Sequence, residues 1–288
     1  MTSAEQPNFW DRVQRCDPRI LYVLFALLMV ALQFWTVSIP APVPAAISRL
    51  YDRVEDLPAE KIVIIDSSMD AGWIAEAEPA MEVLVRHLFR KNIRFALFTN
   101  TTFSQGQRFG KDITGRLARE MGKEYGKDYC IWQAVALQGA GAGATIQALA
   151  KDIRRTVVAD INGTPLAEVP MMRDVTDISG VSLIYRVAYD WEYISWVGFV
   201  QAVYGTPYAV GTASISSSSA YPFVDSGQMC GLVSGAAGAA AYERLLKVSG
   251  SGTRRAAIQS FATLYVVLAI VLGNIAMLAA RRKRVTQT

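Results

Sequence analysis

The sequence is poor in the residues that most often build metal and nucleophile sites. It has one histidine, His87, which excludes any mechanism or metal site that needs two imidazoles. Its three cysteines are Cys16, Cys130 and Cys230. They form no CxxC pair and no cluster with histidine, so a structural zinc site is not expected. Cys130 and Cys230 fall in the same predicted domain, and their spacing leaves open whether they form a disulfide.

Charge is absent from two long stretches. Residues 20–39 and 261–280 contain no Asp, Glu, Lys or Arg and are mostly apolar. About 20 apolar residues are needed to cross the bilayer core as a helix, so each stretch predicts a transmembrane helix. The first is longer than the apolar part of a signal peptide, and no small-x-small cleavage site closes it. We therefore interpret residues 20–39 as an uncleaved anchor.

Basic residues next to the two stretches predict the orientation in the membrane. Residues 281–284 are all Arg or Lys, and the N-terminal tail adds Arg12, Arg15 and Arg19. Such residues favour the cytoplasmic side, although Arg254 and Arg255 precede the second stretch on the other side. We expect residues 1–19 and 281–288 to be cytoplasmic tails and the middle of the chain to be extracytoplasmic. Because topology accounts for the clustered positive charge, we expect no nucleic acid partner.

Apolar runs and amphipathic segments alternate between the two stretches. After a proline-rich linker and short helix at 40–60, residues 61–248 predict one α/β domain, and 249–260 a second linker. The alternation favours a doubly wound, Rossmann-like, mostly parallel sheet flanked by two transmembrane helices. Residues 156–180 do not fit and suggest a long excursion; the serines at 216–219 suggest a loop. The predicted strands are 61–66, 94–98, 129–137, 181–187 and 207–213, and the predicted helices are 76–91, 111–125, 144–155, 193–204 and 227–247.

The end of the first predicted strand offers a candidate site. Asp66, Ser68 and Asp70 follow the apolar run, at the edge where parallel sheets bind ligands. The spacing is close to the Asp-x-Ser-x-Ser metal-ion adhesion pattern, whose oxygen ligands suit Mg²⁺ or Ca²⁺. Thr99, after the second strand, would also suit a phosphatase of the haloacid dehalogenase type, but Ser68 replaces that motif's usual general acid. The simplest alternative is that Asp66 caps a turn.

Two further features allow a functional and a structural interpretation. The sequence Gly-Ala-Gly-Ala-Gly-Ala at 139–144 fits the loose dinucleotide fingerprint, but it follows the third strand and lacks the acidic partner, so a close-packed loop is the simpler interpretation. His87 stands among Arg86, Arg90 and Lys91 near a predicted helix end, where cations favour the helix dipole.

Small residues and buried amides suggest contacts between chains. Gly231, Gly235 and Gly238 give the predicted helix at 227–247 a small-residue stripe, which fits close packing either on the sheet or on a neighbouring chain. Gln33 and Asn274 are the strong amides of the two apolar stretches and lie at different depths, so each needs a backbone carbonyl or another subunit as its partner.

Aromatic residues follow the fourth predicted strand. Residues 190–193 read Asp-Trp-Glu-Tyr and would lie on the same edge as Asp66. A pocket there could bind a sugar or peptide, and a partner protein explains the composition equally well.

Parts of the domain resemble an uncharacterised family of bacterial two-span membrane proteins. The resemblance is carried by EPAM at 78–81 through RHLFRK at 86–91, by EYGKDY at 124–129, and by SGQM at 226–229 through AAYE at 240–243. It covers most of residues 40–280 and implies a bacterial inner-membrane protein with an α/β middle domain. It brings no catalytic residues with it.

Three functions follow from these observations, in order of preference. The first is a non-enzymatic subunit that assembles with copies of itself or with other membrane proteins, without a cofactor. The second is a ligand- or metal-binding domain that uses the Asp66 edge, with a divalent cation as the candidate cofactor. The third is a degenerate phosphatase-like hydrolase.

Overall fold

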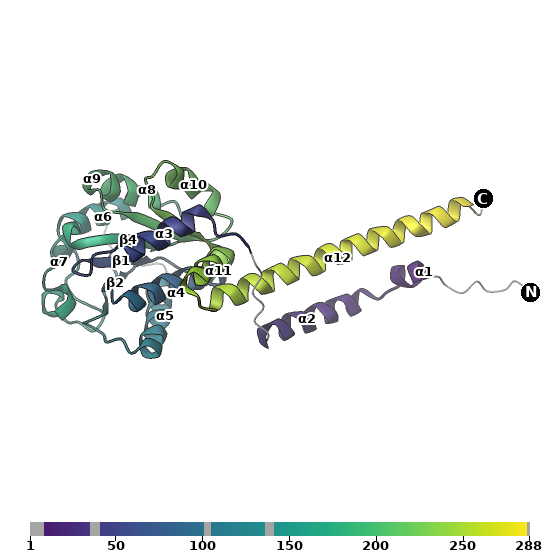
Figure 1. Cartoon of the computed structure of the whole chain (residues 1–288), viewed down its shortest axis with the longest axis horizontal. Coiled ribbons are helices and arrows are strands. Elements are labelled where there is room, and N and C mark those ends of the chain that lie inside the picture. The colour runs from purple at the N-terminus through teal and green to yellow at the C-terminus, as the bar shows by residue number, and fades with distance from the viewer. Residues whose placement is uncertain (1–8, 35–40, 101–104, 136–140, 287–288) are drawn as a thin grey trace, which may run out of the picture. The chain divides into compact units, whose positions relative to one another are not determined.

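The computed structural model describes residues 9–34, 41–100, 105–135 and 141–286 (Figure 1). The chain divides into two compact units. Residues 1–39 and 254–288 form the helical unit, and residues 40–253 form the α/β unit.

The helical unit contains α1 (Phe9–Gln14), α2 (Pro18–Phe34) and most of α12 (Ser251–Thr286). Within α12, 29 residues from Ser251 to Ala279 are apolar enough to cross a membrane. At 1.5 Å per residue they extend about 43 Å, more than the ~30 Å of the bilayer core. The 17 residues of α2 extend only about 26 Å, and its predicted continuation to residue 39 lies outside the described residues. One membrane-spanning helix is thus supported and the second is not confirmed.

The α/β unit is built on a six-stranded sheet in which all pairs are parallel, in the order β3-β2-β1-β4-β5-β6. This order confirms the predicted α/β class and is that of doubly wound, Rossmann-like sheets. Nearly every strand residue is buried, as expected for a sheet covered on both faces. The strands are β1 (Ile62–Ser67), β2 (Phe95–Phe98), β3 (Tyr129–Ile131), β4 (Val181–Val187), β5 (Tyr208–Thr212) and β6 (Gly231–Ser234).

Two apolar clusters cover the two faces of the sheet. Alternate residues of β1 enter each, Val63 and Ile65 one and Ile62 and Ile64 the other. The first face is covered by α3 (Ala45–Glu55), α4 (Ile74–Lys91), α5 (Gly106–Met121) and α11 (Gly235–Leu246). The second is covered by α6 (Ala142–Lys151), α7 (Ile153–Thr156), the turns η1 (Leu166–Glu168), η2 (Pro170–Met172) and η3 (Ile178–Gly180), the run α8 (Tyr193–Trp196) and η4 (Val197–Gln201), and α10 (Ser217–Asp225). The run continues into α9 (Ala202–Tyr204), which has no buried residue.

Several predicted elements differ from those observed. The helix predicted at 227–247 is strand β6 followed by α11, and the serines at 216–219 enter α10 instead of a loop. The third strand ends at Ile131 because the chain leaves the sheet there, well before residue 137. The linker predicted at 249–260 is mostly helix, since α12 begins at Ser251.

The sheet order keeps the two domain cysteines apart. Cys130 belongs to β3 and Cys230 directly precedes β6, so they lie at opposite edges of the sheet. Five strand spacings separate the edges by roughly 24 Å, whereas a disulfide needs Cα atoms within about 7 Å. Both thiols are free, and they cannot pair within this fold.

Candidate functional site

The candidate site lies where the strand order reverses. Chain order runs outward from β1 in one direction and from β4 in the other. In sheets of this order, ligands bind beyond the carboxyl ends of the two strands at the reversal. Asp66 near the end of β1 is the register partner of Arg186 in β4. The two side chains therefore lie on the same face of the sheet, next to each other.

Asp66 is fully buried and uses both carboxylate oxygens. Arg186 Nη1 and Trp196 Nε1 donate to Oδ2, the latter at 3.1 Å. Ser68 Oγ donates to Oδ1 at 2.8 Å, and the backbone N–H of Asn100 approaches the same oxygen at 3.4 Å. Asp66 is thus the centre of a buried polar cluster, not an accessible nucleophile.

Arg186 is also fully buried and contacts two further carboxylates. Its Nη2 lies 2.9 and 2.8 Å from the oxygens of Asp190 and 3.1 Å from Oε2 of Glu192. Burial alone would lower the pKa of Arg186, but Asp66, Asp190 and Glu192 together raise it, so the guanidinium stays charged. Burial raises the pKa of Glu192 despite the attraction of Arg186.

Several buried polar atoms of this cluster have no hydrogen-bond partner among the described residues. Among them are Nε of Arg186 and the hydroxyl of Tyr208, whose ring stacks on Trp196 at a centroid distance of 6.3 Å. Burial raises the pKa of Tyr208 well above its ordinary value, so the hydroxyl keeps its proton and can donate. Buried donors ordinarily have a hydrogen-bond partner, which can be an ordered water.

Aromatic residues follow β1 and β4 in the chain, and we call Trp73, Tyr189 and Trp191 the aromatic rim. Trp191 is 67% exposed and Tyr189 49%, and the rings of Trp73 and Tyr189 meet edge-on at 5.4 Å. A hydrogen bond to Asp70 raises the pKa of Tyr189. The side chain of Asp190 remains 41% exposed beside the rim. The segments that follow β1 and β4 thus combine aromatic faces with carboxylates.

The structure brings together some of the predicted site residues. Asp66 and Ser68 share a hydrogen bond, whereas Asp70 accepts a bond from the backbone N–H of Gly72 in a turn at the surface. Thr99 is buried after β2. Among the described residues, no group of three or more His, Cys, Asp or Glu side chains is arranged to hold a metal ion. The contacts of Asp66 go beyond a simple turn cap, and the metal-adhesion and phosphatase interpretations stay predictions.

Arg186 and Trp196 are the site residues that sequence reasoning missed. They lie 120 and 130 residues from Asp66, so no local spacing connects them to it. One signal was present: a charged residue inside a strand of a covered parallel sheet must have a buried partner of opposite charge. Asp66 is the partner of Arg186, because it lies near the carboxyl end of β1, as Arg186 does in β4.

The glycines predicted as an interface lie inside the α/β unit. A side chain at Gly231 would meet Leu50 and the carbonyl of Ala46 in α3, and one at Gly235, where φ is +54°, would meet Ser214 Oγ at 2.1 Å. Gly238 packs on Val233 of β6. Because packing within the chain explains all three, they no longer support contact with a neighbouring chain.

Among the remaining sequence candidates, Asn274 has a local explanation. Asn274 donates to the carbonyl of Ile270 one turn earlier in α12, at 2.9 Å, and Gln33 is exposed near the end of α2. Part of the Gly-Ala repeat, residues 139 and 140, lies outside the described residues, and α6 begins at Ala142.

His87 is buried in α4 and bonded on both ring nitrogens. Nδ1 lies 2.8 Å from the Tyr242 hydroxyl and Nε2 3.0 Å from Oε1 of Glu55, while the ring stacks on Tyr51. Burial lowers the pKa of His87, although Glu55 opposes this. The sequence predicts that His87 is a cation that interacts with the helix dipole. In the structure it is instead a buried imidazole that favours the neutral form.

This shift predicts a loss of stability in mild acid. Between its lowered folded pKa and the ordinary value of 6.5, His87 binds a proton in the unfolded chain but not in the folded one. The free energy of unfolding should therefore fall as pH drops below 6.5, by up to about 1.4 kcal/mol per pH unit. Urea unfolding between pH 7.5 and 5.5 should show this slope in the natural chain and a smaller one in His87→Gln. Equal slopes in the natural chain and in His87→Gln would show that His87 does not cause the loss of stability in mild acid.

No protein-family model matches the chain, and no curated protein or solved structure matches it either.

Proposed function

We propose that this chain is a membrane-anchored, non-enzymatic binding protein whose α/β unit recognises a cationic group at the aromatic rim. The proposed arrangement has two spans, α2 and α12, with both termini in the cytoplasm of a bacterium and the α/β unit outside it. The length and apolar character of α12 support the anchor. The basic residues at 281–284 support the orientation.

The burial of Asp66 carries this proposal. A nucleophile, general acid or metal ligand at this strand end would need a free carboxylate oxygen, and both oxygens of Asp66 are occupied by Arg186, Trp196 and Ser68. The site therefore supports binding better than catalysis. The groups left accessible above the buried cluster are rings and carboxylates.

A cation is the ligand that this combination suits. Five carboxylates lie at or near the ends of β1 and β4, and Arg186 balances only part of their charge. Aromatic faces attract cations, more strongly where carboxylates lie beside them. An organic ammonium group could thus contact Trp191 and Tyr189 while Asp190 supplies the opposite charge. The carboxylates are Asp66, Asp70, Glu76, Asp190 and Glu192.

Assembly with other proteins stays a second proposal. The glycines no longer support it, but Trp191, Ile194 and Ile215, which is 88% exposed, present large apolar side chains on the loops and helix that follow β4 and β5. Apolar and aromatic side chains in such a position are typical of a protein contact. Under this proposal the cationic group belongs to a Lys or Arg side chain of the partner.

Binding of choline to the detergent-solubilised full chain tests the cation proposal. Choline should raise the melting temperature, and its neutral isostere 3,3-dimethyl-1-butanol should not. Trp191→Ala should weaken choline binding about two- to fivefold, the value of one exposed cation–π contact. Tyr204→Ala is the matched control, because Tyr204 is an exposed aromatic residue beyond the other end of the sheet, just before β5.

Equal shifts with choline and its isostere, or none with either, would refute the cation proposal. Mg²⁺ and Ca²⁺ in the same assay test the divalent-cation hypothesis, for which a shift abolished by Asp70→Asn is required. Native mass spectrometry of the same samples reports the oligomeric state, and a monomer at every concentration would count against assembly into homo-oligomers.

A further inference from the structure

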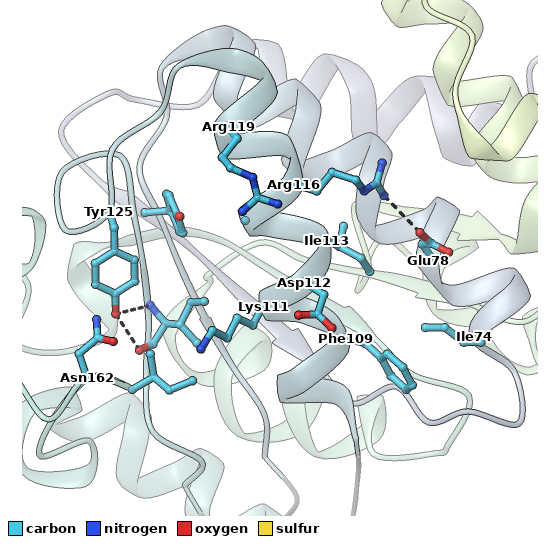
Figure 2. Close-up of a pocket in the computed structure, with 14 residues that line it drawn as sticks. Ile74, Glu78, Phe109, Lys111, Asp112, Ile113, Arg116, Arg119, Tyr125 and Asn162 are labelled. Carbon is cyan, nitrogen blue, oxygen red and sulfur yellow. Dashed lines mark hydrogen bonds and ion pairs between the residues drawn. The ribbon is translucent and has the colours of Figure 1, made fainter.

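A concave surface lies beside α5 (Figure 2). Its volume is about 820 Å³, within the range of small-molecule sites. We call it the α5 trough. Helix α5 forms one wall, with β3 and the segment around Ile161 and Asn162 opposite.

Two cations of the α5 trough have no acidic partner. Among the described residues, neither Lys111 nor Arg119 forms an ion pair or a side-chain hydrogen bond. Arg116 of the same helix, in contrast, pairs with Glu78 at 3.2 Å. Figure 2 shows Lys111 extending toward the side of Tyr125 and Asn162 and Arg119 running along α5, whereas Arg116 turns toward Glu78.

The spacing along α5 leaves room between these two cations. Lys111, Gly115 and Arg119 are four residues apart and share one face of the helix. Gly115 adds no side chain between them, and a Cβ there would stand 3.6 Å from Nη1 of Arg119. Glycine in a helix costs about 1 kcal/mol relative to alanine, so its presence on this face fits a need for space.

The opposite wall is rigid and partly aromatic. Tyr125 donates its hydroxyl to Asp160 at 2.8 Å, and Asp160 also accepts the backbone N–H groups of Asn162 and Thr164. These bonds fix the segment that faces Lys111. Tyr125 and Tyr129 meet edge-on at 5.4 Å, and both line the trough. An apolar ring can therefore pack beside two cations.

We propose that the α5 trough binds a small organic anion, in which a phosphate or carboxylate group contacts Lys111 and Arg119 and an apolar body lies against Tyr125 and Tyr129. The trough contains two acids as well, but Glu78 is paired with Arg116, and only Asp112 opposes the two unpaired cations. This site is independent of the cation-binding proposal, since the two share no residues.

Phenyl phosphate is the probe, because it joins an anionic group to a ring. Isothermal titration of the solubilised full chain should show binding of phenyl phosphate that is tighter than that of inorganic phosphate, with no binding of phenol. The double variant Lys111→Ala/Arg119→Ala should weaken phenyl phosphate binding at least about tenfold. Gly115→Leu fills the trough while keeping both charges, and it should weaken binding similarly.

The matched control is Lys151→Ala/Arg155→Ala, which removes two exposed cations from α6 and α7. It should bind phenyl phosphate as the natural chain does. The proposal is overturned if the natural chain binds no phenyl phosphate at millimolar concentration, or if both double variants lose binding equally. If inorganic phosphate binds as tightly as phenyl phosphate, the proposed contact of the ligand with Tyr125 and Tyr129 is wrong. Benzoate in the same titration shows whether the site prefers a carboxylate or a phosphate.

Discussion

Replacing Arg186 with methionine is expected to lower the free energy of unfolding by about 3–5 kcal/mol. The substitution fills much of the same volume but leaves the carboxylate of Asp66 buried without its counter-charge, which is the costly half of breaking a buried ion pair. Asp190 and Glu192 lose their partner as well. Urea unfolding of the solubilised chain, followed by near-ultraviolet circular dichroism, measures the effect.

A second substitution separates the missing charge from the altered packing. In Asp66→Asn/Arg186→Met the uncompensated carboxylate is gone, so the double variant should be more stable than Arg186→Met alone. Lys127→Met is the control, since its pair with Glu124 is exposed and should be worth less than about 1 kcal/mol. If Arg186→Met costs no more than Lys127→Met, the buried cluster does not stabilise the fold as described.

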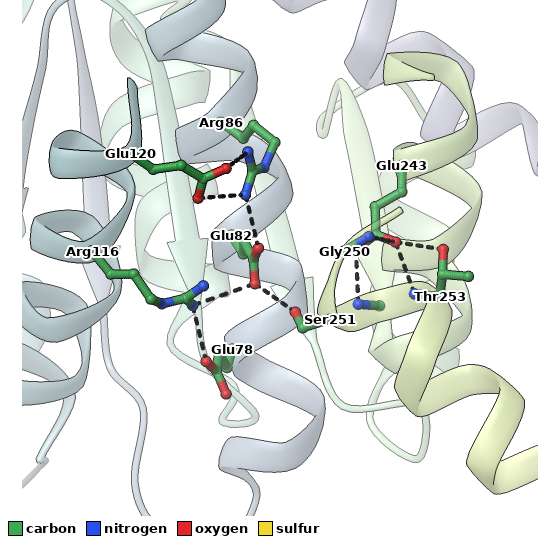
Figure 3. Close-up of polar contacts among 10 residues, drawn as sticks. Glu78, Glu82, Arg86, Arg116, Glu120, Glu243, Gly250, Ser251 and Thr253 are labelled. Carbon is green, nitrogen blue, oxygen red and sulfur yellow. Dashed lines mark hydrogen bonds and ion pairs between the residues drawn. The ribbon is translucent and has the colours of Figure 1, made fainter. Parts of the chain in front are cut away.

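Glu243→Gln is expected to lower the free energy of unfolding by about 2–4 kcal/mol. Its buried carboxylate accepts the backbone N–H groups of Gly250, Gly252 and Thr253 at 2.8–3.0 Å, and the Thr253 hydroxyl at 2.5 Å (Figure 3). An amide cannot accept all four bonds, and its NH₂ would face donors. Unmade bonds to a charged acceptor cost about 1–3 kcal/mol each.

Hydrogen exchange locates this effect. Amide protons at 250–254 should exchange faster in Glu243→Gln, while those of β1 lose protection only through global unfolding. Glu120→Gln is the control, because Glu120 is half exposed and pairs with Arg86 at the surface of the neighbouring network (Figure 3). It should cost less than about 1 kcal/mol. Unchanged exchange at 250–254 in Glu243→Gln would show that the carboxylate does not hold the start of α12.

The sequence predicted most of the sheet but not all of it. Strands β1 and β4 were predicted almost to the residue because their apolar runs are continuous and end sharply. Strand β6 was missed because Gly231–Ser234 is short and runs directly into the alanine-rich α11, so the local pattern is that of one helix. Pairing with β5 and close packing on α3 determine the strand, and neither is a local property.

The candidate site was predicted in position but not in chemistry. Asp66 stood out because it ends a buried strand at the ligand edge. Its counter-ion and its indole donor come from β4 and α8, which long connections separate from β1. Local motifs therefore present Asp66 as a ligand or a turn cap, whereas its burial requires a partner of opposite charge. Trp191 was recognised as part of the same edge because it directly follows β4.

The Asp66–Arg186 contact has a consequence for the order of folding. Strands β1 to β3 and strands β4 to β6 are each contiguous in the chain, and within the sheet the two sets of strands pair only through β1 and β4. Bringing together residues 120 positions apart is slow because loop closure must precede the contact. Until the halves dock, each exposes one charge that water must solvate. Docking in a wrong register would bury both charges unpaired, so this ion pair selects the correct register as the sheet closes.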